Sequence, residues 1–363
     1  MTKPPAKSAR ARHAATLADV GREAGVSIMA ASAVLNGART SSRISDETRV
    51  RILAAAEKLH YRANATARAL VDRRMNAIGV ATTLSRNELN QYFLEVFNGV
   101  IEAAAEFEQN TTVFAVPDWK EGASRIPRIC DSRIDGLILL APLMEIEAAK
   151  YLPDHTPIVS VHANHEMPNV INLESDEESG AFEMVRHMLE LGHRRILHVG
   201  GPSDSIGAMR RVSGYLGAHA AAGVKPLDDY IIPGDFTTHS GRRELEAWLQ
   251  HHRGDPLPQA IFAASDAIAI GCLDALSARG LRTPADISVV GFDDTMLARS
   301  AHLATVRQPL REMGHRAVRL LMDRIEAKHR DAIYRGPFNI VLPTEIVPGQ
   351  SLAAPRTRAL AIS

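Results

Sequence analysis

Charged and aromatic side chains follow several apolar runs in the second half of the chain, where they could bind a small polar molecule. Arg211 lies in a helix-like stretch after RRILHVGGP, Asp293 ends DISVVGFDD, and Phe236 follows YIIPGD. A carboxylate and a guanidinium that meet in a cleft hold hydroxyl groups by charge-assisted hydrogen bonds, and an aromatic ring stacks on the apolar face of a sugar. These residues predict a site for a sugar-like ligand. The alternative is that Arg211 and Asp293 form only a structural ion pair.

The chain lacks the short motifs that carry catalysis. It has no G-x-S-x-G, no phosphate-binding G-x-x-x-x-G-K and no histidine cluster with metal-ligand spacing. Its two cysteines, Cys130 and Cys272, are far apart in the sequence, which favours a reducing cytoplasm over a disulfide framework. We therefore expect no catalytic residue, no metal site and no cofactor. No apolar run approaches the roughly 20 residues that span a bilayer, and the basic N-terminus lacks the apolar segment of a signal peptide.

Strand-like apolar runs alternate with helix-like stretches after Asn76. A first series is AIGVATT, TTVFAVPD, DGLILLAP and PIVSVHAN, and a second is RRILHVGG, YIIPGDF, QAIFAASD and DISVVGFDD. Strands that alternate with helices indicate parallel sheets covered on both faces. The predicted fold class is therefore α/β with two Rossmann-like subdomains, whose facing strand ends form a cleft.

Charge is divided unevenly along the chain. Residues 1–75 hold 14 Lys and Arg against 6 Asp and Glu, a net charge of +8, whereas the remainder holds 28 against 36, a net charge of −8. A basic segment joined to an acidic body favours a polyanionic partner at one end only, although a solvated charge cluster would give the same numbers.

The basic segment also has the pattern of a helix-turn-helix. Thr16 with Asp19 is a capping box for a first helix, Gly25 permits a tight turn, and Ser27 can cap a second helix that ends at Asn36-Gly37. Ser45 can cap a third helix, DETRVRILAAAEKLH, whose Val50, Leu53, Ala54 and Leu59 are expected to cover the first two. The N-terminal residues of the second helix, Ser27, Ile28 and Met29, would enter the major groove of DNA, unless Ile28 and Met29 are core residues of an ordinary bundle.

The next stretch, YRANATARALVDRRMN, predicts a short helix capped by Asn64. Such a helix is marginal alone in water, and it can fold on DNA with an apolar side chain wedged into the minor groove. The alternative is a plain linker.

The run from Thr16 to Gly79 resembles the head and hinge of the lactose-repressor (LacI/GalR) family of bacterial regulators. The matching stretches are TLADV, EAGVS, S-x-VLNG at 32–37, S-x-ETR at 45–49 and Y-R-x-N-x-x-A-R-x-L at 61–70. In the remainder, I-D-G-L-I, L-G-H-R-R-I, R-x-x-G-Y and I-S-V-V-G-F-D-D are similar to the family's core. The resemblance implies an all-α DNA-binding head, a hinge helix and a periplasmic-binding-protein-like core.

The resemblance also implies roles for individual residues. Ser27, Ile28 and Met29 take the reading positions, and Ala67 and Leu70 take the minor-groove positions, with Leu70 as the wedge. The further residues expected at the DNA are Thr16, Leu17, Ser32, Asn36, Arg43, Ser45, Thr48, Tyr61, Asn64 and Arg68. The residues expected at the effector are Tyr92, Phe93, His162, Arg211, Phe236, Ser265, Asp266, Asp293 and Gln308.

Several positions depart from the family pattern. Ala33 replaces an arginine, Ala63 replaces a proline, and the connection 38–44 is longer than usual, so we expect either an operator unlike the family's usual one or a hinge that orders less readily. His162 stands where a sugar-binding member can carry an aspartate, and Ser205 and Gly207 are small, which disfavours purine and lactose-type ligands. A sugar or sugar acid remains the expected effector.

These observations predict a sequence-specific transcription regulator of the cytoplasm, a repressor that acts as a homodimer on operator DNA and binds no membrane. The expected organisation is a disordered basic arm (1–15), a helix-turn-helix (16–60), a hinge helix (61–75), a core (76–350) and a tail (351–363). Within the core, 76–175 with 305–335 form the first subdomain, and 176–304 with 336–350 form the second. Two rivals remain open: a periplasmic binding protein, which would bind ligand and no duplex DNA, and an enzyme that turns over a sugar.

Overall fold

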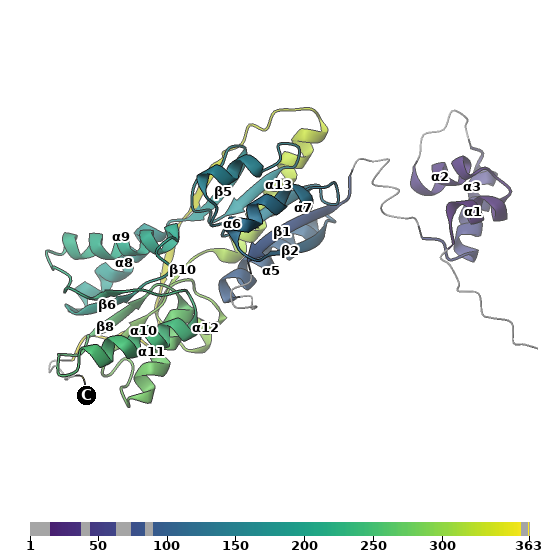
Figure 1. The fold of residues 1–363 in the computed structure, drawn as a ribbon. Helices are drawn as coiled ribbons and strands as arrows, with labels where there is room; N and C mark the ends of the chain where they lie inside the picture. Colours follow the sequence, from purple (N-terminus) through teal and green to yellow (C-terminus); the bar gives the residue numbers. More distant parts are fainter. Residues whose placement is uncertain (1–14, 38–43, 63–73, 84–89, 357–361, 363) are drawn as a thin grey trace, which may run out of the picture. The chain divides into compact units, whose positions relative to one another are not determined.

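The computed structural model describes residues 15–37, 44–62, 74–83, 90–356 and 362. The chain divides into two compact units, a head of residues 1–76 and a core of residues 77–363 (Figure 1). Within the described residues, no helix is both long and apolar enough to cross a membrane.

Three short helices form the described part of the head: α1 (Leu17–Ala24), α2 (Ile28–Asn36) and α3 (Asp46–Lys58). Thr16 and Asp19 make the reciprocal capping box, with the Asp19 amide donating to Thr16 Oγ1 at 3.3 Å. Gly25 ends α1 in the left-handed conformation, with φ of 66°, and Ser27 and Ser45 cap α2 and α3. Each cap satisfies a backbone group at a helix end that water would otherwise have to bind. The predicted helices and the glycine turn between the first two are all present, so the predicted helix-turn-helix is confirmed.

The third helix of the head packs through a different face from the one that the sequence analysis predicts. Val50, Leu53 and Ala54 are exposed, whereas Ile52, Ala55 and Ala56 are buried in the core of the head. Both sets have the i, i+3, i+4 spacing of a helical face. The observed set continues to Leu59 at i+7, which packs half-buried against the same cluster, so only Leu59 of the predicted contacts is correct.

The first lobe of the core is a six-stranded parallel sheet in the order β11-β5-β4-β3-β1-β2. Its strands are β1 (Ala77–Thr83), β2 (Asn110–Val116), β3 (Gly136–Leu140), β4 (Ile158–Val161), β5 (Val170–Ser175) and β11 (Asn339–Leu342). Helices α5 (Gln91–Glu106) and α13 (Leu310–His329) cover one face, and α6 (Trp119–Gly122), α7 (Ile126–Ile129) and the 3-10 turns Ala123–Arg125 and Ile146–Tyr151 lie on the other side (Figure 1). Burial on both faces explains the nearly continuous apolar runs of these strands.

Helix α5, which brings Tyr92 to the cavity between the lobes, is held tightly against α13. A Cβ atom on Gly99 would lie 2.0 Å from the carbonyl oxygen of Arg311, and one on Gly314 would lie 2.1 Å from the carbonyl oxygen of Val96. The two glycines therefore let the helix backbones approach more closely than any side chain would permit.

The second lobe is a four-stranded parallel sheet in the order β7-β6-β8-β9. Its strands are β6 (Ile196–Val199), β7 (Ile231–Ile232), β8 (Ala260–Ala263) and β9 (Ser288–Val290), and its helices are α8 (Glu177–Glu190), α9 (Ile206–Ala221), α10 (Thr238–His251), α11 (Asp266–Ala278) and α12 (Met296–Ser300). All eight strand-like runs of the two predicted series form strands, and the predicted fold class is confirmed.

The chain crosses between the lobes at points that differ from the predicted boundaries. We expect residues 336–350 in the second subdomain, but β11 pairs in parallel with β5 and extends the first sheet. Of residues 305–335, which we expect in the first, α13 packs on the first sheet as predicted. Only β10 (Thr305–Arg307) departs, because it pairs with β12 (Glu345–Val347) and a bridge joins Arg307 to Asp293, after β9. The predicted tail also packs on the second lobe, because Ser351 hydrogen-bonds Val289 and Ala304, and Ile362 is buried.

Candidate functional site

A cavity of about 520 Å³ opens between the two lobes of the core. Its walls include residues that follow strands of both sheets, among them His162 after β4, Phe236 after β7 and Asp293 after β9. Ligands of open parallel sheets bind beyond the carboxyl ends of the strands, because loops from several strands converge there. A cavity of this volume accommodates a small organic molecule.

Arg211 of α9 is buried in the wall of this cavity and is held from several sides. Its Nη2 atom lies 2.7 Å from Glu177 Oε1 and 3.7 Å from Asp293 Oδ1, and its Nη1 atom donates to the carbonyl of Ala264. The guanidinium carbon lies 4.1 Å from the centre of the Phe292 ring. Arg211 is therefore fixed before any ligand arrives, which lowers the entropy lost on binding.

The two carboxyl groups beside Arg211 differ in charge. Burial opposes ionisation of Glu177, but the charge of Arg211 holds its pKa below the usual value, so Glu177 carries a negative charge. Burial dominates at Asp293, where the pKa rises to about 8 despite the attraction of Arg211. Asp293 is thus protonated near neutral pH, and its partner Gln308 donates to Asp293 Oδ1 at 2.6 Å.

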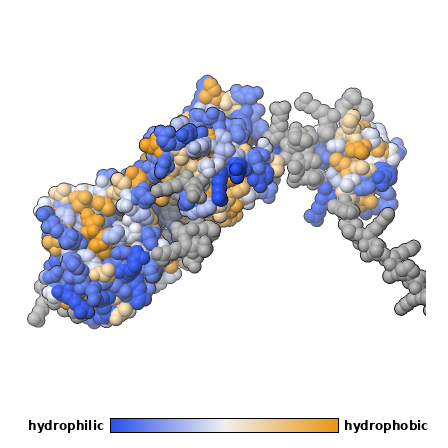
Figure 2. Space-filling model, viewed as in Figure 1, coloured by the Kyte–Doolittle hydropathy of each residue, from blue (hydrophilic) through white to orange (hydrophobic). Residues whose placement is uncertain are grey.

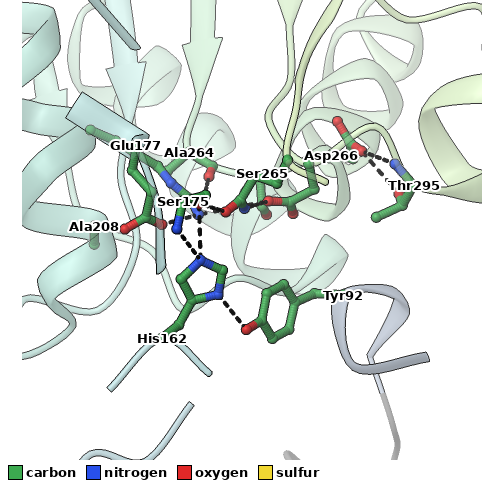
Figure 3. A network of polar contacts seen from close by, with 12 residues as sticks. Tyr92, His162, Ser175, Glu177, Ala208, Ala264, Ser265, Asp266 and Thr295 are labelled. Atoms are coloured by element: carbon green, nitrogen blue, oxygen red, sulfur yellow. Dashed lines mark hydrogen bonds and ion pairs between the residues drawn. The ribbon is translucent and has the colours of Figure 1, made fainter. Parts of the chain in front are cut away.

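His162 links the cavity to the chain segments that cross between the lobes (Figure 3). His162 Nε2 lies 3.2 Å from the amide nitrogen and 2.9 Å from the hydroxyl oxygen of Ser175, and His162 Nδ1 lies 2.6 Å from Tyr92 Oη. Burial lowers the pKa of His162 and raises that of Tyr92, so both stay neutral. His162 thus holds the Tyr92 side chain in the cavity wall.

Four residues of the cavity wall have an unusual backbone. Ala141, His162, Phe236 and Asp293 have φ of 45°, 52°, 62° and 119°, although none is glycine. L-amino acids with a side chain rarely adopt these conformations, and such strain concentrates at ligand sites. Three of the four, all except Ala141, are residues that the sequence analysis places at the effector.

Seven of the nine predicted effector residues line the cavity: Tyr92, Phe93, His162, Arg211, Phe236, Ser265 and Asp293. Asp266 does not, because it turns into the protein, where its Oδ2 atom accepts the Thr295 amide at 2.7 Å and its Oδ1 atom accepts from Thr305 (Figure 3). Gln308 is also buried behind the wall, where it joins Asp293 to Ser175. Contact of the seven with a ligand stays a prediction.

The structure adds three charged residues that the sequence analysis missed. Glu177, Arg210 and Asp235 all line the cavity, and Arg210 pairs with Glu174 at 2.5 Å. The signal for Glu177 is the acidic run ESDEES, which places charges where a strand leads into a helix. Polar Asn172 and Glu174 within strand β5 make the end of this strand hard to recognise from the sequence.

In the head, several of the predicted DNA-binding residues lie at the first turns of the helices, among them Thr16, Ser27 and Ser45. Ile28 and Met29, at the start of α2, are 54% and 71% exposed, and Figure 2 shows apolar surface on the head. Thr16, Ser27 and Ser45 are caps, Ser32 bonds Asn36, Thr48 bonds Ser45, and Leu17 and Tyr61 pack half-buried on the head's core. Arg43, Asn64, Ala67, Arg68 and Leu70, with the expected hinge helix, lie outside the described residues.

Each of the two units matches a known protein family. Residues 16–64 match the family of bacterial regulatory proteins called the lacI family, and residues 185–352 match a periplasmic binding protein-like domain. The chain is 30% identical over 317 residues to catabolite control protein A of Priestia megaterium, an alignment that covers 84% of this chain and 91% of that protein. The chain belongs to the lacI family.

Solved structures agree with membership in the lacI family. The Lac repressor dimer bound to operator and the anti-inducer ONPF has a TM-score of 0.79 and 28% identity, with 94% of this chain and all of that chain covered. The complex of the transcriptional regulator CelR with cellobiose has a TM-score of 0.68 and 27% identity, with coverage of 93% and 99%. Both solved structures cover the head and the core of this lacI-family chain.

Tyr92→Phe should weaken the binding of a cavity ligand about tenfold, because it removes a hydroxyl group from the cavity wall and leaves His162 Nδ1 without its hydrogen-bond partner. Isothermal titration with a sugar found by thermal-shift screening measures the change. Tyr151→Phe is the matched control, since Tyr151 is 47% exposed and does not line the cavity. Equal affinity of Tyr92→Phe and wild type would remove this hydroxyl from the site.

Proposed function

We propose that this chain is a sequence-specific transcription repressor that binds operator DNA through its head and a sugar or sugar-acid effector in the cavity of its core. The observation that carries the proposal is the start of α2, where two large apolar side chains, Ile28 and Met29, stand exposed on a capped helix. Such residues gain nothing in water, and they fit the methyl groups of thymine in the major groove.

The proposed assembly is a homodimer on a nearly palindromic operator. The Lac repressor dimer bound to operator supports a dimeric assembly. The proposed effector chemistry is supported by polar walls that combine a fixed guanidinium, two carboxyl groups and the Phe236 ring. A complex of a related regulator with cellobiose supports the same class of ligand. We also propose a cytoplasmic location and no catalytic turnover. Within the head, we propose a DNA-binding helix-turn-helix of residues 16–60 and a hinge helix of residues 61–75.

Replacing Ile28 and Met29 together by alanine tests the DNA-binding face. We expect at least about a tenfold loss of affinity for a duplex selected by the wild type, with little change for random duplex, since apolar base contacts carry specificity and phosphate contacts do not. Fluorescence anisotropy at fixed salt measures both affinities.

The control for this double substitution is Val50→Ala. Val50 is also apolar and 64% exposed, but it lies on α3, so its loss should leave operator affinity unchanged. Exposed positions also predict a free energy of unfolding within about 0.5 kcal/mol of wild type for all three sites. An operator affinity that survives the double substitution would contradict the assignment of α2.

A further inference from the structure

Arg210, Arg211 and Glu177 of the cavity wall form a compact charge cluster with Glu174, which pairs with Arg210 beside the wall. Arg210 and Arg211 are neighbours on α9, and Glu174 and Glu177 stand three residues apart where β5 leads into α8. The Arg211–Glu177 pair measures 2.7 Å and the Arg210–Glu174 pair 2.5 Å, while Arg210 Nη1 lies 3.7 Å from Glu177 Oε2. Each guanidinium therefore already faces a carboxylate.

Glu177 holds this arrangement together. Its side chain is 3% exposed and contacts both arginines. It also lies against the first turn of α9, since a Cβ atom on Gly207 would fall 2.6 Å from Glu177 Oε1. A helix N-terminus stabilises a negative charge. Three features thus keep the Glu177 carboxylate ionised at this place: two guanidinium groups and the end of α9.

The charge cluster determines whether a charged group or a hydroxyl group of a ligand binds favourably beside the two arginines. In a site with free arginines, a ligand carboxylate or phosphate would gain strong bidentate hydrogen bonds. Here such a group would displace or approach Glu177, and like charges brought together without water between them repel strongly. Hydroxyl groups meet no such repulsion, because they both donate to the carboxylate and accept from the guanidinium.

We propose that Glu177 sets the charge selectivity of the cavity: by neutralising Arg211 and Arg210 it excludes carboxylate- and phosphate-bearing compounds and leaves a site for uncharged polyhydroxy ligands. This inference rests on the proposed function, because it takes the cavity as the effector site. It narrows the expected effector from sugars and sugar acids to uncharged sugars.

The test compares uncharged sugars with their acids in the full chain. The probes are D-glucose with D-glucuronate, D-galactose with D-galacturonate, and inorganic phosphate, each titrated at constant ionic strength and followed by thermal shift and calorimetry. Glu177→Gln keeps the hydrogen-bond acceptor for Arg211 and removes the charge. Glu178→Gln removes the same charge one residue further on, where the side chain is exposed and outside the cavity wall.

We expect the wild type and Glu178→Gln to bind neither acid nor phosphate more tightly than the uncharged sugar. Glu177→Gln should bind the acids and phosphate at least about tenfold more tightly than the wild type does. Adding Asp293→Asn to Glu177→Gln should preserve the gain, because it removes the carboxyl that could otherwise ionise beside Arg211.

Two results would overturn the inference: a wild type that prefers a uronate to its parent sugar, or a folded Glu177→Gln protein with no gain for any anion. The wild-type comparison needs no substitution, so it decides the matter even if Glu177→Gln does not fold. Operator titration is a separate readout. A protein that selects uncharged sugars but binds no operator would contradict the proposed function and leave the charge selectivity intact.

Discussion

Arg211→Ala should abolish ligand binding in the cavity and lower the free energy of unfolding by about 3–5 kcal/mol. The side chains of Arg211 and Glu177 are 6% and 3% exposed, so removing the guanidinium leaves a buried carboxylate without its partner. The same guanidinium packs on the Phe292 ring and donates a hydrogen bond to the carbonyl of Ala264. The substitution therefore removes a ligand-binding group and also changes the packing of the cavity wall. Chemical denaturation measures the stability, and calorimetry with a sugar hit measures the binding.

Two further variants separate the roles of Arg211. Arg186→Ala is the matched control, because Arg186 forms exposed ion pairs on α8 that contribute less than about 1 kcal/mol. Combining Arg211→Ala with Glu177→Gln should recover much of the stability and none of the binding, since the uncompensated charge is gone but the donor is still missing. Normal ligand binding by Arg211→Ala would refute the site.

The contribution of His198 to the stability of the second lobe should be lost as the pH falls from about 6.5 to about 4, which a comparison of wild type with His198→Phe isolates. His198 of β6 is fully buried, its Nδ1 atom hydrogen-bonds the carbonyl of Phe262, and its Nε2 atom has no partner among the residues that the structure describes. Burial lowers the pKa of His198 from 6.5 to about 4. Between these pH values His198 binds a proton in the unfolded chain but not in the folded chain. Its contribution to the free energy of unfolding is therefore fully present above pH 6.5 and is lost as the pH falls toward 4.

The expected loss from His198 alone is about 3 kcal/mol. Burial also lowers the pKa of His193 and His219, which act in the same direction, whereas the raised pKa values of Asp266 and Asp293 oppose it. His198→Phe removes one group from this set, and exposed His251→Gln is the control. The free energy of unfolding of wild type minus that of His198→Phe should fall by about 3 kcal/mol between pH 6.5 and pH 4, whereas the difference between wild type and His251→Gln should stay constant; parallel curves for all three proteins would be the contrary result.

The sequence predicted those features whose causes are local. Thr16, Ser27 and Ser45 act within three residues of the amides that they cap, so their helix starts could be placed from the chain alone. Arg211 and Asp293 could be found because polar side chains after buried parallel strands meet at one edge of a sheet.

The failures concern choices that only tertiary packing makes. On α3, two sets of residues have the same helical spacing, and packing against Val20 and Ala31 selects Ile52 with its small neighbours. The strand β11 joins β5 although some 160 residues separate them, a pairing that no local pattern records. Asp266 follows a strand as Asp293 does, yet Thr295 and Thr305 draw its carboxylate inward.

The measurement that bears most directly on this account is an anisotropy titration of the full chain with a duplex selected from random sequence, carried out at one salt concentration with and without a bound sugar. The account predicts tight binding to the selected duplex, weak binding to random duplex, and a change of at least about fivefold in the first affinity when the sugar is present. Equal affinity for the two duplexes, unaltered by any ligand of the cavity, would contradict it.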